Sequence, residues 1–395
     1  MNLTLNKVSK NYKKVNPSTY FQTFNRKSID KLEKKRKDLF QNKLHFPIEL
    51  FKQKKLLDLG SGTGMYSLIY NLWGSDCTLL EYDLNSFEKS KKIFGKFERK
   101  NSQNSFENKN LFDFKGKFTL DKKRILYDVV HCNGVLHHTS NKELGIKIMA
   151  DNLRSGGFLI LGASIVTGFL QRNLQRYLLF SISKNEKEII KNAQKYFKRH
   201  LIRASKSSGR SINATIYDTY INYKIDSYSL NSLMKIFKKN KIDFYSSFPA
   251  INPINDDEME WGENKNNYPR KQSLNFTNFI WSTRNQPQKN EKFETFSEDI
   301  LHISKGLNDI SYENIKKISS KISKLKKNIN NIILKNKKEN AHTSKTHTYF
   351  QEINTLIKII DNKEIIKLKK FLNNAKYLFK GYSGVGMNYF IGIKK

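Results

Sequence analysis

The segment with the clearest chemical meaning is Asp58-Leu59-Gly60-Ser61-Gly62-Thr63-Gly64, which follows a short apolar run. Glycines let the backbone turn tightly, adopt positive φ and come close to a ligand. The helix expected from Met65 would present free N–H groups, which suit a carboxylate of that ligand. The spacing is G-x-G-x-G, which disfavours the G-x-G-x-x-G site of nicotinamide and flavin enzymes. The predicted cofactor-binding residues of this segment are Asp58, Gly60, Ser61, Gly62 and Gly64.

A carboxylate nineteen residues beyond Gly64 extends this prediction. Asp83 ends a second apolar run, in Leu80-Glu81-Tyr82-Asp83-Leu84-Asn85, and a carboxylate there can accept hydrogen bonds from both hydroxyls of a ribose. We therefore expect Asp83 and Leu84 to bind the cofactor. Glu81 is the close rival, because a small error in register would exchange the two acids. The alternative for Asp83 is a structural role, capping the helix that starts near Asn85.

Three ordered motifs resemble one known family. The segment Leu57–Gly64 resembles the first S-adenosylmethionine (SAM) motif of class I SAM-dependent methyltransferases. The segment Tyr127–Thr139, YDVVHCNGVLHHT, resembles the fourth-strand motif of the ubiquinone-methyltransferase-like branch, and Leu153–Ile160 resembles its turn into strand five. Three motifs at the family's spacing are more specific than one, and they cover roughly residues 50–165. The resemblance implies SAM as the cofactor and no metal.

The resemblance also assigns the two ends of the cofactor. The family often has an acidic residue near the adenine, but here Asn110 stands at that position, with Asp113 three residues later. An asparagine can still hydrogen bond the adenine amino group, since it offers donors and an acceptor. The resemblance thus implies Asn110 and Leu111 at the adenine, and Asn133 at the methionine end of SAM.

Two histidines follow the fourth-strand motif, close to where the methyl group should point. Methyl transfer is an in-line displacement, so alignment of donor and acceptor supplies much of the catalysis. A base is required only if the acceptor must lose a proton. His138 is our candidate for that general base, with His137 beside it. The alternative is that one histidine caps the next helix or packs under a lid.

A group of aromatic and acidic residues later in the chain is a candidate wall of the acceptor pocket. Tyr217, Asp218 and Tyr220 lie close together in a segment predicted to cover the cofactor domain. Tyrosine rings could line such a pocket, and Asp218 could bind a polar substrate. The alternatives are that the tyrosines are residues at the edge of the core and that the aspartate caps a local turn.

These residues need a framework of alternating strands and helices. Strands are expected at Leu56–Leu59, Cys77–Tyr82, near Phe106, and at the ranges 127–132, 158–162, 243–248 and 387–394, with helices at Met65–Trp73, Ser86–Phe97, Glu143–Leu153 and Leu230–Lys239. Alternation of this kind indicates an α/β fold with βαβ units. The resemblance implies a Rossmann-like seven-stranded mixed sheet, six strands parallel and the last antiparallel.

The expected organisation has five parts. They are a helical N-terminal leader (1–50), a SAM-binding core (51–165), a helical cap with the sixth strand (166–251), a long polar and helical insertion (252–386) and the final strand of the core (387–395). The cap would follow strand five at the carboxyl edge of the sheet, where ligands bind in such folds.

The formal net charge of +36 is extreme, and it raises the question of a nucleic-acid partner. The basic residues are 12 Arg and 60 Lys, in a chain also rich in Asn, Ile, Phe and Tyr. Dedicated phosphate and base readers favour arginine, so compositional drift is preferred as the explanation. The leading hypothesis is a methyltransferase for a small-molecule metabolite. The alternatives are a nucleic-acid methyltransferase and a non-catalytic scaffold that binds SAM.

The cellular location is predicted from the cysteines, the N-terminal residues and the apolar segments of the sequence. Cys77 and Cys132 fall in expected core strands and form neither a disulfide framework nor a zinc spacing. The N-terminal residues 1–14 are polar, without the apolar stretch of a signal peptide. The most apolar segment, Phe158–Leu170, is too short to span a bilayer. We expect a cytoplasmic protein with no membrane span.

Overall fold

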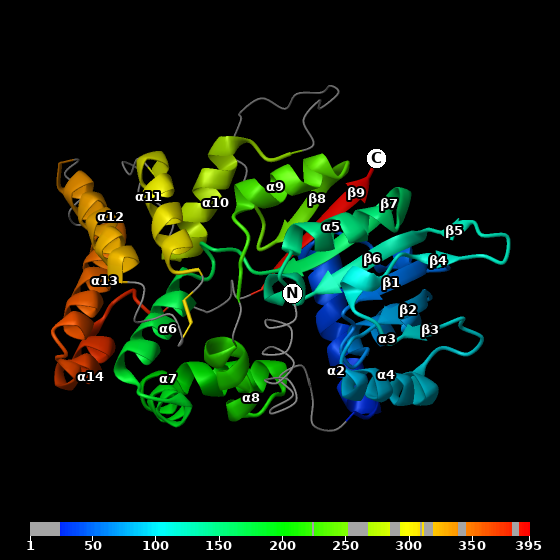
Figure 1. The fold of residues 1–395 in the computed structure, drawn as a ribbon, viewed down its shortest axis with the longest axis horizontal. Coiled ribbons are helices and arrows are strands. Elements are labelled where there is room, and N and C mark those ends of the chain that lie inside the picture. Colours follow the sequence, from blue (N-terminus) through cyan, green and yellow to red (C-terminus); the bar gives the residue numbers. More distant parts are fainter. Residues whose placement is uncertain are drawn as a thin grey trace.

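A seven-stranded sheet organises the computed structural model, which describes residues 24–222, 225–251, 268–284, 293–308, 310–311, 319–338, 345–380 and 387–395 (Figure 1). The strand order is β3-β2-β1-β6-β7-β9-β8. The strands are β1 (Lys55–Leu59), β2 (Asp76–Leu80), β3 (Ser105–Glu107), β6 (Tyr127–Asn133), β7 (Leu153–Ala163), β8 (Ile242–Phe248) and β9 (Asn388–Lys394). A separate hairpin joins β4 (Lys117–Phe118) to β5 (Arg124–Ile125).

The pairing confirms the predicted mixed sheet. Strands β3, β2, β1, β6 and β7 pair in parallel, whereas β9 runs antiparallel to both of its neighbours, β7 and β8. Six strands therefore share one direction and the last strand opposes them. The central strands are buried on both faces, which explains why they read as continuous apolar runs such as Leu56-Leu57 in β1.

Helices cover both faces of this sheet. One face packs against α2 (Arg26–Lys37), α3 (Met65–Leu72) and α4 (Leu84–Phe97), whose apolar residues share a core with β1 and β2. The other face packs against α5 (Lys142–Asp151) and α9 (Leu230–Lys239). The helix expected to run to Leu153 ends two residues earlier, because Leu153 already pairs with Tyr127 as the start of β7.

The remaining helices form a second apolar core beside the carboxyl edge of the sheet (Figure 1). The helices from the predicted cap are α6 (Leu170–Ile182), α7 (Glu186–Ser208), α8 (Ile212–Ile216) and the short turn η5 (Tyr217–Ile221). Those from the predicted insertion are α10 (Lys271–Thr283), α11 (Phe293–Gly306), α12 (Ser319–Lys338), α13 (Lys345–Asp361) and α14 (Ile365–Asn374). Both groups contribute to one cluster of buried side chains, so they pack as a common helical layer.

Two observations concern the described part of the chain only. None of its helices combines the length and the apolar character that a membrane crossing requires. None of its His, Cys, Asp and Glu side chains gather in threes or more in a way that could hold a metal ion.

Candidate active site

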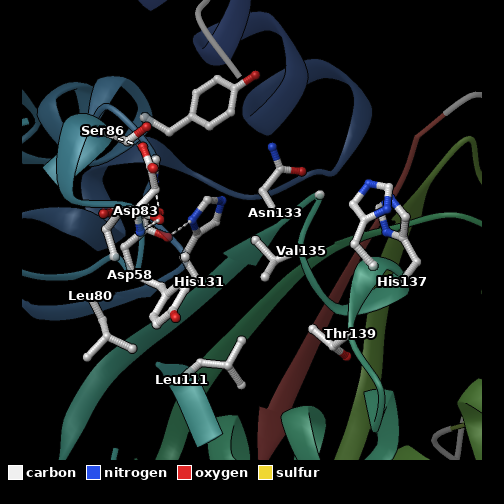
Figure 2. A pocket seen from close by; sticks show the side chains of 18 of the residues that line it. Asp58, Leu80, Asp83, Ser86, Leu111, His131, Asn133, Val135, His137 and Thr139 are labelled. Carbon is white, nitrogen blue, oxygen red and sulfur yellow. Dashed lines mark hydrogen bonds and ion pairs between the residues drawn. The ribbon is translucent and has the colours of Figure 1, made fainter. Parts of the chain in front are cut away.

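A cavity of about 320 Å³ lies at the carboxyl ends of β1, β2 and β6 (Figure 2). Its walls come from two sources. The sheet side contributes the glycine segment, the ends of β2 and β6 and the residues around Asn110, and the helical layer contributes residues of α6, of η5 and of the loops beside them. The cavity therefore joins the predicted cofactor site to the predicted cap.

The glycine segment has the positive φ angles that its composition predicts. Gly60, Gly62 and Gly64 have φ of +74°, +57° and +72°. The N–H groups of Gly60 and Ser61 donate to the carbonyl oxygen of Leu80 at 2.8 and 3.0 Å, which ties the turn to the end of β2. Gly60, Ser61 and Gly62 line the cavity.

Gly64, a predicted cofactor-binding residue, does not line the cavity. It precedes α3 in the left-handed conformation. A Cβ atom at this position would lie 2.9 Å from Leu79 Cδ2 and 3.0 Å from Ser90 Cβ. Gly64 therefore allows α3 and α4 to pack closely on the sheet.

The two acids after β2 point to different partners. Glu81 accepts hydrogen bonds from the N–H of Gly62 at 2.7 Å and from the N–H of Asp83 at 2.8 Å. Burial raises the pKa of the Glu81 carboxyl, opposed by these backbone hydrogen bonds. The Asp83 side chain accepts from the N–H of Ser86 at 2.9 Å and caps α4. Both acids line the cavity, but Glu81 is the one joined to the glycine segment.

Leu84 does not fit its predicted role, because it is 60% exposed and lies outside the cavity lining. It is the first residue of α4 and follows the capping Asp83. The helix start turns its side chain toward solvent.

Asp58 and His131 form a buried pair that the sequence analysis did not anticipate. His131 Nδ1 lies 2.8 Å from Asp58 Oδ1, and Ser67 Oγ donates to the other oxygen of the same carboxylate. Both residues are almost wholly buried and line the cavity. The available signal was a histidine inside the otherwise apolar strand YDVVHCN.

Three other predicted cofactor residues line the cavity, namely Asn110, Leu111 and Asn133. Asn110 Oδ1 accepts from the N–H of Phe112 at 3.0 Å, which leaves its amide NH₂ for a ligand. Asn133 packs over Gly162, where a Cβ would lie 1.7 Å from Asn133 Oδ1. Because Gly162 in β7 has no side chain, the Asn133 side chain can pack against the strand at this point.

His137 and His138 both line the cavity, with ring centroids 4.1 Å apart. Both belong to the short helical turn Leu136–His138 that follows β6, and Figure 2 shows His137 there. His137 is buried, and burial, followed by the nearby His138, Arg172 and Lys142, lowers its pKa well below the ordinary value. His137 is therefore neutral at physiological pH, and its ring can accept a proton or a hydrogen bond.

The residues of the predicted acceptor wall divide between the cavity and the helical layer. Asp218 lines the cavity and pairs with Arg210 at 2.7 Å. Tyr217 and Tyr220 are buried outside the cavity lining, and their hydroxyls donate to Glu186 and to Gln175, the latter at 3.1 Å. Consecutive positions of a helical turn face different directions, so Asp218 can face the cavity while its neighbours pack in the helical layer.

Several lining residues were missed. They are Tyr66 on α3, Phe169 and Arg172 at the start of α6, Arg210 after α7, and Met387 and Tyr389 at the start of β9. Nothing in their local sequence marks them, since they meet only when distant segments pack.

The comparison with known families concerns the part of the chain that holds the glycine segment. Residues 26–199 match the family described as a methyltransferase domain. Residues 26–199 are a SAM-dependent methyltransferase domain. The activity of this methyltransferase domain is methyl transfer, and its cofactor is SAM.

Solved structures similar to the chain include other methyltransferases. The YcgJ protein from Bacillus subtilis is 14% identical, with a TM-score of 0.30, and the match covers 49% of this chain and 63% of that one. PKMT2 from Rickettsia typhi is 14% identical, with a TM-score of 0.39, covering 51% and 43%. Magnesium protoporphyrin IX methyltransferase from Synechocystis PCC 6803, with bound SAM, is 12% identical, with a TM-score of 0.32, covering 62% and 76%.

The match thus spans less than two thirds of the first two of these proteins. No curated protein matches the chain significantly.

The cavity of the methyltransferase domain fits its cofactor. Ser61 Oγ, His131 Nε2 and Asn133 Oδ1 are buried and have no hydrogen-bond partner among the described residues. All three residues line the cavity, so they stand beside the space that SAM would occupy. A Cβ built on Gly62 would meet no atom within 4 Å, which leaves the backbone there open to a ligand.

Proposed function

We propose that this protein transfers the methyl group of SAM to an oxygen, nitrogen or carbon atom of a small-molecule metabolite. The observation that carries the proposal is the continuity of one cavity from the glycine segment to Phe169, Arg172 and Asp218 of the helical layer. One cavity with a cofactor end and a far end lined by a second layer is what transfer between two small molecules requires.

Glu81 is our proposed ribose ligand in place of Asp83. Its carboxylate already accepts the N–H of Gly62, so it stands beside the backbone that the cofactor must approach. The Asp83 carboxylate is engaged at the start of α4. We assign Asn110 and Leu111 to the adenine, and Ser61 and Asn133 to the methionine end.

His131 is proposed as a positioning residue for the methionine end. His131 Nδ1 lies 2.8 Å from Asp58 Oδ1, which holds the ring in place, and a ring with its single proton on Nδ1 would offer Nε2 as a hydrogen-bond acceptor. The α-ammonium group of SAM is a donor of matching chemistry.

SAM supplies a methyl group on a positively charged sulfonium. The chain's own contribution is alignment and, where the acceptor carries a proton, its removal. We propose His138 as that base. Neutral His137 beside it is the second candidate, since its Nδ1 is buried and has no hydrogen-bond partner among the described residues.

The second candidate function is methylation of nucleic acid, for which the net charge of +36 is the motivating observation. The charge is carried mainly by lysine, and the far end of the cavity is lined by residues of α6 and η5. Both features support the small-molecule acceptor. A cytoplasmic location stays part of the proposal, and the burial of Cys77 and Cys132 as free thiols is compatible with it.

The test is methyl transfer from radiolabelled SAM into an extract of the source cells by the purified full-length protein. The label is separated into acid-soluble and acid-precipitable fractions, with and without nuclease. Acid-soluble label is the expected result. Precipitable label that nuclease releases would replace the metabolite by nucleic acid. Binding of SAM without any transfer would support the non-catalytic scaffold.

A further inference from the structure

We infer that the acceptor carries an anionic group, a carboxylate or a phosphate, and that Arg172 at the far end of the cavity binds it. This inference rests on the proposed function, because it describes the acceptor end of the same site. It adds the chemical class of the substrate, which the methyltransferase domain alone does not define.

Arg172 is a cation facing the cavity without a counter-ion. It is the third residue of α6, lines the cavity and has its guanidinium carbon 4.5 Å from the centre of the Phe169 ring. No described carboxylate forms an ion pair with it. A cation in a partly buried site without an anion is costly, so the site is suited to receive one.

The neighbouring acid does not neutralise Arg172, because another arginine holds it. Asp218 is paired with Arg210 at 2.7 Å. One turn beyond Arg172, Arg176 is buried and donates to the carbonyl oxygens of Asn222 and Ile310, at 3.2 and 2.7 Å. Arg172, Arg176 and Arg210 together therefore outnumber the one carboxylate of Asp218.

The titration of nearby groups agrees with this excess of positive charge. Burial, followed by the charges of Arg172 and Arg203, lowers the pKa of His200 to about 4. Burial also lowers the pKa of Arg172 itself, with Arg210 acting in the same direction and Asp218 and Tyr220 opposing. An anion bound at Arg172 would relieve this repulsion.

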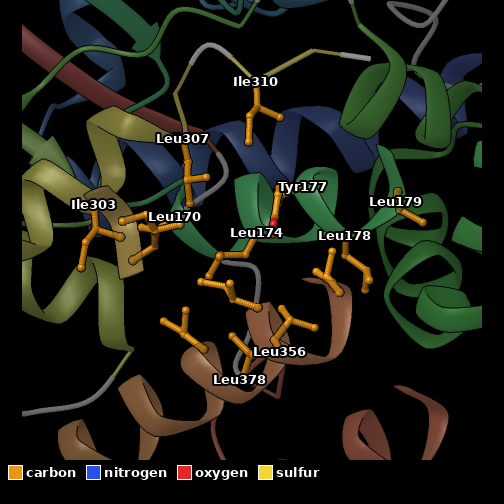
Figure 3. Close-up of a cluster of buried hydrophobic side chains, with 14 of the residues drawn as sticks. Leu170, Leu174, Tyr177, Leu178, Leu179, Ile303, Leu307, Ile310, Leu356 and Leu378 are labelled. Atoms are coloured by element: carbon orange, nitrogen blue, oxygen red, sulfur yellow. The ribbon is translucent and has the colours of Figure 1, made fainter. Parts of the chain in front are cut away.

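The helix that carries Arg172 strengthens the same preference and holds it in place. Arg172 stands in the first turn of α6, where the positive end of the helix dipole disfavours a cation and favours an anion. Leu170, Leu174 and Leu178 of α6 anchor it in the buried cluster of the helical layer (Figure 3). A planar guanidinium on a rigid helix can bind carboxylate or phosphate with two parallel hydrogen bonds.

The rival assignment is that Arg172 binds the carboxylate of the cofactor. S-adenosylhomocysteine, the product form of SAM, distinguishes the two because it has that carboxylate but leaves the acceptor end empty. The experiment therefore measures two affinities by titration calorimetry on the full-length protein. The first is for S-adenosylhomocysteine alone, and the second is for inorganic phosphate or succinate added to the protein saturated with it, at constant ionic strength.

We expect phosphate or succinate to bind the saturated wild-type protein, and Arg172→Gln to weaken that binding tenfold or more. Arg172→Lys should give an intermediate loss of anion affinity, since lysine keeps the positive charge but lacks the planar guanidinium that donates two parallel hydrogen bonds. Both variants should bind S-adenosylhomocysteine within twofold of wild type, which also shows that they are folded. Lys91→Gln removes a surface cation of α4 as the matched control and should change neither affinity.

The inference would be overturned if neither anion bound the saturated wild-type protein, or if Arg172→Gln bound them as wild type does. A tenfold loss of S-adenosylhomocysteine affinity in Arg172→Gln, with a melting temperature unchanged from wild type, would assign this arginine to the cofactor instead. Failure of the wild-type protein to bind S-adenosylhomocysteine at all would contradict the proposed function, a separate outcome. The ratio of phosphate to succinate affinity then indicates which anion the natural acceptor carries.

Discussion

Glu81 Oε2 accepts a hydrogen bond from the backbone N–H of Gly62 across 2.7 Å. This bond joins the carboxyl end of β2 to the middle of the glycine segment, the two parts of the chain between which a ribose would lie. Asp83, only two residues further, directs its carboxylate to the N–H of Ser86. The structure thus separates an acid that is bound to the glycine segment from an acid that caps a helix.

Replacing each acid by alanine should separate these roles. Glu81→Ala should weaken S-adenosylhomocysteine binding by roughly ten- to hundredfold, the loss expected for hydrogen bonds to a charged group. Asp83→Ala should lower the free energy of unfolding by about 1 kcal/mol, as loss of an N-cap does, with affinity near wild type. Calorimetric titration and urea denaturation measure the two effects. If Asp83→Ala loses affinity for S-adenosylhomocysteine and Glu81→Ala does not, Asp83 is the ribose ligand.

The glycine at the start of α3 should be needed for stability. Gly64→Ala forces a Cβ into a position with φ of +72° and within 2.9 Å of Leu79 Cδ2, so we expect a loss of about 2 to 4 kcal/mol. Gly95→Ala is the control, because its Cβ would meet no atom within 4 Å inside α4. It should stabilise by about 0.5 to 1 kcal/mol. Equal effects of the two changes in urea denaturation would contradict this assignment.

The two histidines after β6 should differ in their effect on turnover. His138→Ala should reduce methyl transfer into acid-soluble product about a hundredfold or more, with S-adenosylhomocysteine affinity retained. His137→Gln keeps a hydrogen-bonding side chain of similar size and should reduce turnover less. A wild-type rate for His138→Ala would leave His138 with a structural role, and a greater loss in His137→Gln would make His137 the base.

Acid should destabilise the protein through its buried histidines. The pKa of His200 is lowered to about 4, and that of His137 is lowered well below 6.5, in both cases chiefly by burial. Above pH 6.5 both the folded and unfolded states are neutral at these groups, so they add no pH dependence there. Below it the unfolded state takes up protons first, and each histidine lowers the free energy of unfolding by up to about 1.4 kcal/mol per pH unit.

His200→Gln provides the check on this pH dependence. The variant should lose about 1 kcal/mol per pH unit of the wild-type slope between pH 6 and 4.5, measured by urea denaturation at each pH. The slopes of the two proteins should coincide above pH 7. Parallel curves through the acid range would show that His200 titrates normally in the folded state.

The sequence by itself determined the sheet and the glycine segment. Buried parallel strands are local apolar runs, and tight turns with positive φ require glycine, so Leu56–Leu59 and Gly60–Gly64 are legible without any long-range contact. The resemblance to class I methyltransferases also implied the mixed sheet with its antiparallel last strand and the cofactor, which the pairing of β9 and the family match confirm.

Only the tertiary structure decided which side chains reach the cavity. Glu81 and Asp83 are two residues apart and both line the cavity, and the packing of the glycine segment against β2 decides which of them accepts the N–H of Gly62. Arg172 and Tyr389 enter the site from segments that are more than 200 residues apart, a meeting that no local pattern encodes. Side-chain direction depends on how elements pack, and that is set by the whole chain.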